Sequence, residues 1–432
     1  MLRSLCLKNI SLAHHLHAEF GARLNVFTGD NGLGKTVLLD AAWWALTGSW
    51  AGLPLAPEFS NGASSIRMEM DVDQPLLAAL RPKRVMPRAG DYDALRREWI
   101  YRDDEWSDAV VLYLQADGSF ALWDAARHVR LEGDQDDPEV VHGAGQRFDP
   151  DTLWNGLKDG DRVACRGLVD DWVTWQLQRD RDPHGRFAAL SAALDTLSPH
   201  PGEWMRPGEP RRVFADDARD FPTVETPYGT VPVVYASAAM KRVLGFAYLL
   251  VWAWNEHREA SKLRGTKTAK QLVLLFDEVE THLHPQWQRR IMPALLSVAG
   301  ALDPQVAVQF IVTTHAPLVL ASLEPRFDPE RDRLFLLELS ASKEVVLEQV
   351  PWAKHGDAQR WLTSEVFGLA QTRSREAEDA VEAAKAFMRG DLSALPPGLN
   401  TKEALDARLR ELLPSQDPFF PRWITYVEGP SP

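Results

Sequence analysis

The sequence has little cysteine and no long apolar run. Its two cysteines, Cys6 and Cys165, are too few for a disulfide framework or a cysteine metal site, which favours a reducing compartment. The longest apolar stretch, Val243 to Trp254, stops at Asn255 and is shorter than the ~18 residues of a membrane span. The first residues lack the continuous apolar segment of a secretory signal. These absences predict a soluble, cytoplasmic protein.

Positive charge is also scarce, because 48 Lys and Arg face 61 Asp and Glu, for a net charge of −13. This balance argues against a protein that coats nucleic acid by bulk charge. At 45% hydrophobic and 25% charged residues, the composition is that of a globular protein with a substantial core. Any DNA contact would need a local basic stretch. Two such stretches occur, each with a solvated face as the alternative: Arg81, Lys83, Arg84, Arg88, Arg96 and Arg97; and Arg258, Lys262, Arg264, Lys267 and Lys270.

The first half of the chain predicts strands followed by a helical insert. Residues 1–129 alternate as strands do, apart from a helix from Lys35 to about Leu46 with apolar residues at helical spacing. The pair Asp117-Gly118 separates two apolar runs, which is a strong hairpin signal. Residues 130–230 are predicted to be a helical insert, because two helical patterns stand there among loops.

The second half predicts an α/β unit and a small helical end. Residues 231–372 alternate apolar strands with long helices, which favours a parallel sheet. Residues 373–432 are expected to form polar helices and a tail. The tail aromatics are predicted either to dock a partner or to pack onto their own domain: Phe419, Phe420, Trp423 and Tyr426.

The strongest local signal is GDNGLGKT, Gly29 to Thr36, between a predicted strand and a predicted helix. It satisfies G-x-x-x-x-G-K-[ST], in which glycines let backbone N–H groups turn toward a phosphate at a helix N-terminus. Lys35 would reach the terminal phosphates of ATP, and Thr36 would ligate Mg²⁺. A glycine-rich turn with an incidental lysine is the alternative. The expected nucleotide contacts are Gly29, Asp30, Asn31, Gly32, Leu33, Gly34, Lys35, Thr36 and Val37.

Two carboxylates follow the apolar run QLVLLF and would lie at the carboxyl end of a buried strand. Asp277 would hold Mg²⁺, and Glu278 would polarise the attacking water as a general base. Capping of the next helix is the alternative for this pair. The presence of a P-loop in the same chain favours the catalytic interpretation.

Histidines supply two further signals. His315 ends the strand pattern FIVTT and would lie at the same sheet edge, where a neutral imidazole can hydrogen-bond a γ-phosphate. A plain turn residue is its alternative. His282 and His284 could ligate zinc, but no third ligand is apparent.

The order of these motifs resembles the ABC-type ATPase head shared by SMC proteins, RecF and the overcoming-lysogenization-defect (OLD) nucleases. Lys35 and Asp277 are 277 − 35 = 242 residues apart, whereas AAA+ proteins place the second motif far nearer the P-loop. The stretches GDNGLGKT, DEVETHLHPQWQR and TTHAPLVLAS look like those of the SMC/OLD-like branch, over roughly residues 1–350. Several members of that branch belong to phage-defence operons, including the PtuA ATPases paired with an HNH nuclease.

The resemblance implies a P-loop NTPase fold with a two-lobed, ABC-type head: lobe I in residues 1–129 and lobe II in residues 231–372. It implies catalytic roles for Lys35, Glu278 and His315, with ATP and Mg²⁺ as cofactors.

Two further roles rest on the resemblance alone. Ser237 matches the signature serine, which in such heads meets ATP held by a second copy, so that ATP joins two heads. Ala238 and Ala239 stand where glycines are common and restrict close approach, which leaves a plain helix cap as the alternative. Gln176 is the expected glutamine that joins the two lobes, with a solvated helix residue as its alternative.

The leading hypothesis is an ATPase that dimerises on ATP and couples its cycle to DNA sensing or clamping, or to a separate nuclease effector such as an HNH protein, in anti-phage defence. No nuclease is expected within the chain, since the residues after Thr372 are too few for a TOPRIM domain. An ATP-binding scaffold with negligible turnover is the second hypothesis, favoured by the altered signature and opposed by Glu278. The ATPase subunit of a membrane transporter is the third.

Overall fold

The structure is a computed structural model of the chain, and it describes residues 1–11, 13–58, 63–72, 84–101, 108–132, 139–198 and 202–428. The chain divides into two compact units, Met1–Ala358 and Gln359–Pro432. The lobe boundaries predicted within the first unit remain predictions. Across the described ranges, no helix is both long and apolar enough to cross a lipid bilayer.

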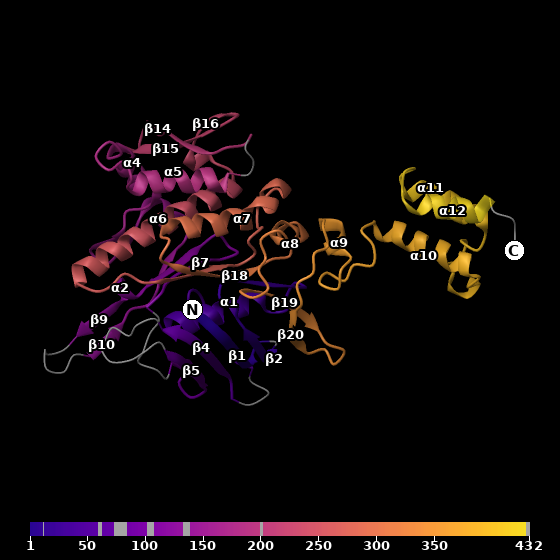
Figure 1. Cartoon of the computed structure of the whole chain (residues 1–432), viewed down its shortest axis with the longest axis horizontal. Helices are drawn as coiled ribbons and strands as arrows, with labels where there is room; N and C mark the ends of the chain where they lie inside the picture. The colour runs from indigo at the N-terminus through magenta and orange to yellow at the C-terminus, as the bar shows by residue number, and fades with distance from the viewer. Residues whose placement is uncertain are drawn as a thin grey trace. The chain divides into compact units, whose positions relative to one another are not determined.

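A mixed sheet of eight strands forms the centre of the first unit (Figure 1). Its middle strands run parallel to one another, and the remaining strands pair antiparallel at the two sides. The predicted hairpin at Asp117-Gly118 joins two of them. In spatial order the strands are β11 (Gln146–Phe148), β8 (Phe120–Asp124), β7 (Val110–Leu114), β17 (Gln271–Phe276), β18 (Ala307–Thr313), β3 (Leu24–Gly29), β19 (Asp332–Leu339) and β20 (Val345–Val350).

A second sheet of five antiparallel strands lies below the first in Figure 1, and α1 (Lys35–Thr47) lies between the two sheets. Trp43 and Trp44 of α1 are fully buried because the helix has apolar neighbours on both sides. In spatial order the strands of this sheet are β2 (Ala13–Glu19), β1 (Leu2–Ile10), β4 (Ser65–Val72), β5 (Arg84–Asp93) and β6 (Glu98–Tyr101).

Helices α6 (Ala238–Arg264) and α7 (Pro285–Leu302) cover the opposite face of the mixed sheet, and α8 (Pro317–Leu323) packs on α7. The apolar run in α6 is buried, including Trp252 and Trp254, so these tryptophans belong to the core as expected. Because β17 is covered on both faces, all six of its residues are buried. The predicted α/β fold is therefore confirmed.

The helical prediction for residues 130–230 is right for two helices and wrong for the segment as a whole. The prolines and glycine in strands such as RPGEPRR and DFPTVET obscure the alternation by which strands are recognised. The helices between β8 and α6 are α2 (Ala125–His128), α3 (Pro150–Asn155), α4 (Leu168–Leu177), α5 (Arg186–Leu197) and the 3-10 turn η1 (Val233–Tyr235). The additional strands there are β9 (Val129–Glu132), β10 (Glu139–His142), β12 (Leu157–Asp159), β13 (Arg162–Cys165), β14 (Arg206–Arg212), β15 (Asp220–Thr226) and β16 (Gly229–Pro232).

The second unit is helical, as predicted, and the aromatic tail packs within it. Phe419, Phe420 and Trp423 are buried against α10 and α11, whereas Tyr426 is 37% exposed. Of the two predictions for the tail, packing onto its own domain is therefore confirmed, and an exposed docking strip is wrong for three of its four aromatics. The helices from the division onward are α9 (Ala358–Leu362), α10 (Arg375–Arg389), η2 (Leu392–Ala394), α11 (Lys402–Leu412) and α12 (Phe419–Glu428).

Candidate nucleotide site

The loop between β3 and α1 has the backbone geometry that a phosphate cradle needs. Gly29, Gly32 and Gly34 adopt φ values of 134°, 80° and 96°, which other residues rarely adopt. A Cβ on Gly29 would lie 2.0 Å from the carbonyl oxygen of Leu337 on the neighbouring strand. The loop therefore requires glycine where the motif has it, and it leads directly into the N-terminus of α1.

Lys35 is 6% exposed and lies inside this loop. Its Nζ donates to the carbonyl oxygens of Gly29 at 2.9 Å and Asp30 at 2.7 Å. Burial lowers the pKa of this ammonium, while the charges of Glu278 and Asp277 oppose that shift. Two backbone carbonyls thus hold the cation inside the glycine loop.

Asp277 lies at the end of β17, is 1% exposed and accepts two hydroxyl hydrogen bonds. The Thr36 hydroxyl donates to Oδ2 at 2.8 Å, and the Thr313 hydroxyl donates to Oδ1 at 2.7 Å. Burial raises the pKa of the Asp277 carboxyl. A carboxylate that faces a hydroxyl at a phosphate loop offers the oxygen ligands that Mg²⁺ prefers, so these residues fit the expected metal.

Glu278 and His315 lie together at the same edge. Glu278 has a φ of 47°, its N–H donates to the Thr313 hydroxyl at 2.7 Å, and its carboxylate accepts from Thr281 Oγ1 at 3.0 Å. His315 Nε2 lies 3.8 Å from Glu278 Oε1. Burial and the charge of Lys35 lower the pKa of His315, which favours its neutral imidazole. A carboxylate and an imidazole therefore lie side by side.

Glu280 is a site residue that the sequence analysis did not identify. Its carboxylate accepts hydrogen bonds from the backbone N–H of His315 and from the Thr314 hydroxyl, the latter at 2.8 Å. Burial raises its pKa. It thereby ties the loop after β17 to the loop after β18. In the sequence, only its position two residues after Glu278 could have indicated that Glu280 belongs to the site.

Arg242 of α6 is a second residue of the site that the sequence analysis did not identify. Its Nη2 donates to the carbonyl oxygens of Asp277 at 2.9 Å and Glu278 at 3.3 Å. Burial lowers the pKa of this guanidinium, and the charges of the acidic residues around it oppose the shift. One arginine thus connects α6 to the backbone of both acidic residues.

Replacing Arg242 by methionine should lower the free energy of unfolding by about 2–4 kcal/mol. Two carbonyls lose a charged donor, and the neighbouring carboxylates lose a half-buried cation. Chemical denaturation measures the change, with Arg258→Met at an exposed position of the same helix as the control, expected within about 0.5 kcal/mol of wild type. Equal losses in both variants would contradict this role for Arg242.

Asp40 of α1 adds a half-buried carboxyl near the site. Burial raises its pKa to about 6, and the charge of Asp277 acts in the same direction. The Tyr113 hydroxyl donates to Asp40 Oδ1 at 3.1 Å. The interior behind the phosphate loop is therefore rich in negative charge, which favours a divalent cation beside Asp277.

Ser237 caps α6, and its hydroxyl accepts from the N–H of Met240 at 3.3 Å. The serine is exposed, so the cap function leaves it accessible to a second molecule. A largely apolar groove of about 570 Å³ begins beside it. Its lining includes Trp204, Tyr228, His282, His284 and Trp287. Within the described part of the chain, no group of three or more His, Cys, Asp or Glu could hold a metal, so zinc at the two histidines gains no support.

Gln176 has a different setting from the one its predicted role requires. It is 3% exposed on α4, where its amide donates to the Gly208 carbonyl at 3.0 Å and accepts from the Trp172 indole at 3.2 Å. A nucleotide contact for Gln176 therefore stays a prediction without geometric support. Gln115 directly follows β7, whose last residue, Leu114, accepts from the N–H of Asp277 at 2.8 Å. The carboxamide oxygen of Gln115 accepts from the Ser119 hydroxyl at 2.6 Å.

Two family models match the chain. The model described as "AAA domain, putative AbiEii toxin, Type IV TA system" matches residues 223–321, which include Ser237, Asp277, Glu278 and His315. The model described as "AAA domain" matches residues 4–71, which include the phosphate loop. Both matches thus fall on the elements that build this site.

The curated proteins similar to this chain include two that are described as Septu protein PtuA. The protein of Bacillus thuringiensis is 30% identical over 388 residues, which cover 87% of this chain and 86% of the relative. The protein of Bacillus mycoides (strain KBAB4) is 33% identical over 100 residues, 23% of this chain and 13% of the relative. Among solved structures, the SMC head domain from Thermotoga maritima aligns with 81% of this chain and 99% of its own, at 16% identity and a TM-score of 0.38.

Proposed function

Since the chain belongs to the family of the Septu protein PtuA, we propose that it is an ATP-hydrolysing head that pairs with a second copy when ATP is bound. The observation that carries this proposal is the meeting of Lys35, Asp277, Glu278 and His315 at one sheet edge, although 315 − 35 = 280 residues separate the first from the last. Hydrogen bonds and short contacts connect the three loops that hold them.

Binding would use the loop Gly29–Thr36, with backbone N–H groups and Lys35 around the phosphates. Thr36 and Asp277 would hold Mg²⁺, which when bound offsets phosphate charge. The Thr313 hydroxyl keeps the Asp277 carboxylate oriented by its hydrogen bond at 2.7 Å. These contacts support positioning of the triphosphate before any chemistry takes place.

Hydrolysis would use Glu278 as the general base for the attacking water. Positioned proton transfer of this kind contributes roughly 10²- to 10⁴-fold to a rate. The neutral imidazole of His315 would hydrogen-bond the γ-phosphate, and Glu280 holds the backbone N–H of His315 in place. Gln115, which follows β7 beside Asp277, is the glutamine we propose at the nucleotide in place of Gln176.

Pairing would bring the exposed Ser237 of one copy to the nucleotide of the other. Ser237→Arg is expected to lower the fraction of dimer at saturating ATP at least about tenfold, because a bulky side chain would occupy a close contact. Sedimentation velocity with and without ATP measures this fraction. The control is Ser342→Arg, in the exposed turn between β19 and β20, which should dimerise like wild type. A wild-type protein whose mass is independent of ATP would refute the pairing.

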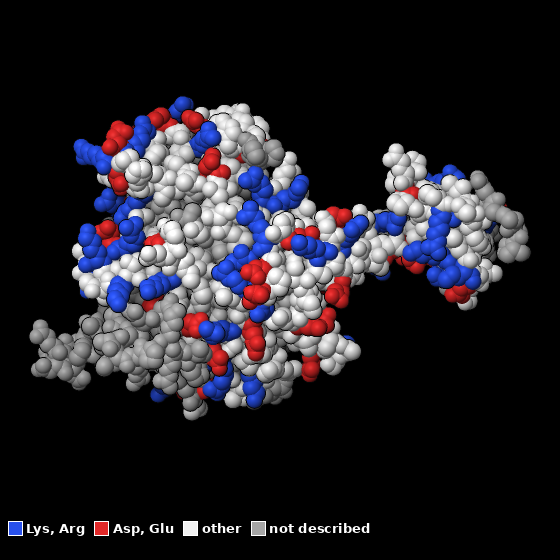
Figure 2. Space-filling model, in the orientation of Figure 1, with Lys and Arg blue, Asp and Glu red and all other residues white. Residues whose placement is uncertain are grey.

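The family membership supports a role in anti-phage defence with a separate effector, which we propose to be a nuclease such as an HNH protein. DNA contact is best supported at the second basic stretch, since Arg258, Lys262, Lys267 and Lys270 are exposed at and beyond the end of α6. Figure 2 shows Lys and Arg side chains over this end of the helix. The first basic stretch has weaker support as a DNA contact. Arg81 and Lys83 lie outside the described residues. Arg88 is 3% exposed, and its guanidinium donates a hydrogen bond to the Tyr101 hydroxyl at 3.1 Å.

Charge reversal at Lys267 and Lys270 together should weaken DNA binding and lower the slope of log K against log salt by about 0.9 for each phosphate that is no longer neutralised. Fluorescence anisotropy with duplex DNA at several salt concentrations gives both values. Reversal at the exposed Lys343 and Lys354 is the matched control and should leave both unchanged. Equal effects of the two pairs would assign the stretch to a solvated face.

A further inference from the structure

The carboxylate of Glu278 depends on its backbone for its direction. The φ of Glu278 is 47°, in the left-handed region that residues with a side chain rarely adopt. Its side chain is 42% exposed. From the residues that the structure describes, this carboxylate accepts one hydrogen bond, from the Thr281 hydroxyl at 3.0 Å. The groups that fix the peptide units around Glu278 therefore decide where a base at this position points.

Hydrogen bonds hold the peptide units on both sides of Glu278. Its N–H donates to the Thr313 hydroxyl at 2.7 Å. Arg242 Nη2 donates to the carbonyl oxygens of Asp277 at 2.9 Å and Glu278 at 3.3 Å. An unusual backbone conformation persists when the groups around it over-determine it, and such conformations cluster at functional sites. Arg242 supplies the part of this support that comes from a helix rather than from the strands of the mixed sheet.

Arg242 lies on the same helix as the serine that is proposed to meet a second copy. It follows Ser237 by 242 − 237 = 5 positions on α6, or about 7.5 Å along the helix axis. Ser237 is exposed at the start of α6, whereas Arg242 is half-buried and directed at the loop after β17. The first turns of α6 thus connect the proposed pairing surface to the backbone of the proposed base within one chain.

We propose that Arg242 is a positioning residue that fixes the direction of the Glu278 carboxylate and links pairing at Ser237 to hydrolysis. This role rests on the proposed ATPase function. Arg242 forms no hydrogen bond to the described loop Gly29–Thr36, so ATP binding does not require it. Pairing does not require it either, because its guanidinium faces its own chain. The step that requires Arg242 is the attack of water, in which the base must be correctly placed.

Arg242→Met should lower kcat for ATP hydrolysis about 10- to 100-fold, because a small displacement of a catalytic group is costly. KM for ATP should stay within about twofold of wild type, and the ATP-dependent dimer should remain. Arg242→Lys should recover part of the rate, since an ammonium keeps the charge but lacks the fork of donors that meets two carbonyls. Phosphate release at several ATP concentrations and sedimentation velocity measure these values, at a temperature where each variant is folded.

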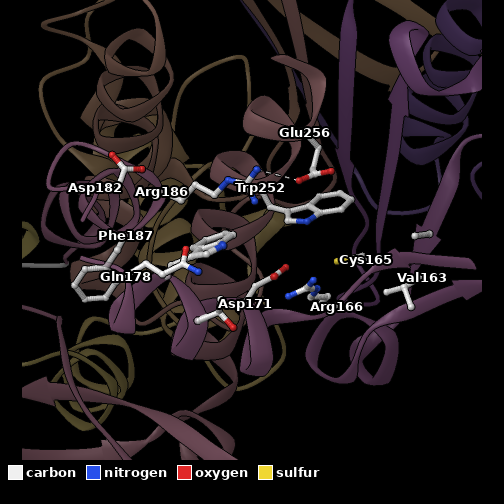
Figure 3. A pocket seen from close by; sticks show the side chains of 13 residues that line it. Val163, Cys165, Arg166, Asp171, Gln178, Asp182, Arg186, Phe187, Trp252 and Glu256 are labelled. Atoms are coloured by element: carbon white, nitrogen blue, oxygen red, sulfur yellow. Dashed lines mark ion pairs between the residues drawn. The ribbon is translucent and has the colours of Figure 1, made fainter. Parts of the chain in front are cut away.

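Two variants elsewhere on α6 are the controls. Tyr248→Phe removes a buried hydrogen bond to Asp171 at 2.8 Å, so it should lower the melting temperature while kcat stays at the wild-type value. Glu256→Gln breaks the ion pair with Arg186 at 3.2 Å, which Figure 3 shows at a cavity of about 500 Å³ that shares no residue with the nucleotide site. It lies 256 − 242 = 14 positions beyond Arg242 and should leave kcat unchanged.

A wild-type kcat in Arg242→Met would overturn this role. A fall in kcat that Tyr248→Phe reproduces would also overturn it, because general loosening of α6 would then explain the loss. Loss of ATP binding or of the dimer together with the rate would assign Arg242 to binding or folding instead. A wild-type protein without ATP hydrolysis would refute the proposed function as well, whereas an active wild type with an equally active Arg242→Met would refute the positioning role alone.

Discussion

Glu278→Gln should lower the steady-state rate of ATP hydrolysis by roughly 10²- to 10⁴-fold, about 3–5 kcal/mol of activation free energy. The amide keeps the size of the carboxylate but cannot take a proton from the attacking water. ATP binding should remain, because the phosphate loop and Lys35 are untouched and the hydrogen bond from the Glu278 N–H to Thr313 involves only the backbone. Phosphate release under saturating ATP measures the rate.

The matched control is Glu348→Gln, an exposed carboxylate on β20, which should hydrolyse ATP at the wild-type rate. The variant also separates the ATPase from the scaffold hypothesis. Equal, near-zero rates in wild type and Glu278→Gln would favour a scaffold that binds ATP without turnover. Retention of full activity in the variant would instead assign the base to another residue.

Lys35→Ala should abolish the stabilisation that ATP confers on the folded protein. A ligand at 100 times its dissociation constant stabilises a protein by about 2.7 kcal/mol. The Lys35 ammonium supplies the one positive charge inside the loop Gly29–Thr36, so its loss should leave binding too weak to register at the same concentration. The difference between melting temperatures with and without ATP and Mg²⁺ measures the effect within each variant.

Comparison within each variant matters, since Lys35 also bonds to the Gly29 and Asp30 carbonyls and its removal can change the stability of the free protein. Lys262→Ala, at an exposed position of α6, is the control and should show the wild-type shift. An undiminished shift in Lys35→Ala would remove Lys35 from the nucleotide site.

The elements that carry motifs were predictable because their signals are local. The glycines of the phosphate loop, the buried run of β17 and the strand before His315 each have a short pattern with a physical cause. Parallel strands then place their carboxyl ends at one edge, which explains why the predicted partners meet. Helix α10 was predictable for the same reason, because Ser374 caps its N-terminus and Gly390 ends it.

Long-range interactions were not predictable. Arg242 reaches the Asp277 carbonyl across 277 − 242 = 35 positions, and Glu280 reaches the His315 loop across 315 − 280 = 35. No periodicity or motif reports such hydrogen bonds, because they depend on packing of α6 against the mixed sheet. The strands near Gly208 were missed since proline and glycine interrupt their alternation. Whether Gln176 or Gln115 contacts the nucleotide could likewise not be decided from the sequence, because it depends on where α4 and β7 lie in the fold.

The most direct test is a crystal structure of Glu278→Gln with ATP and Mg²⁺. We expect the triphosphate to lie along Gly29–Thr36, with Thr36 and Asp277 at the metal and Ser237 of a second copy near the γ-phosphate. An empty phosphate loop in crystals grown at saturating ATP, or a nucleotide bound elsewhere on the chain, would contradict the proposed ATPase.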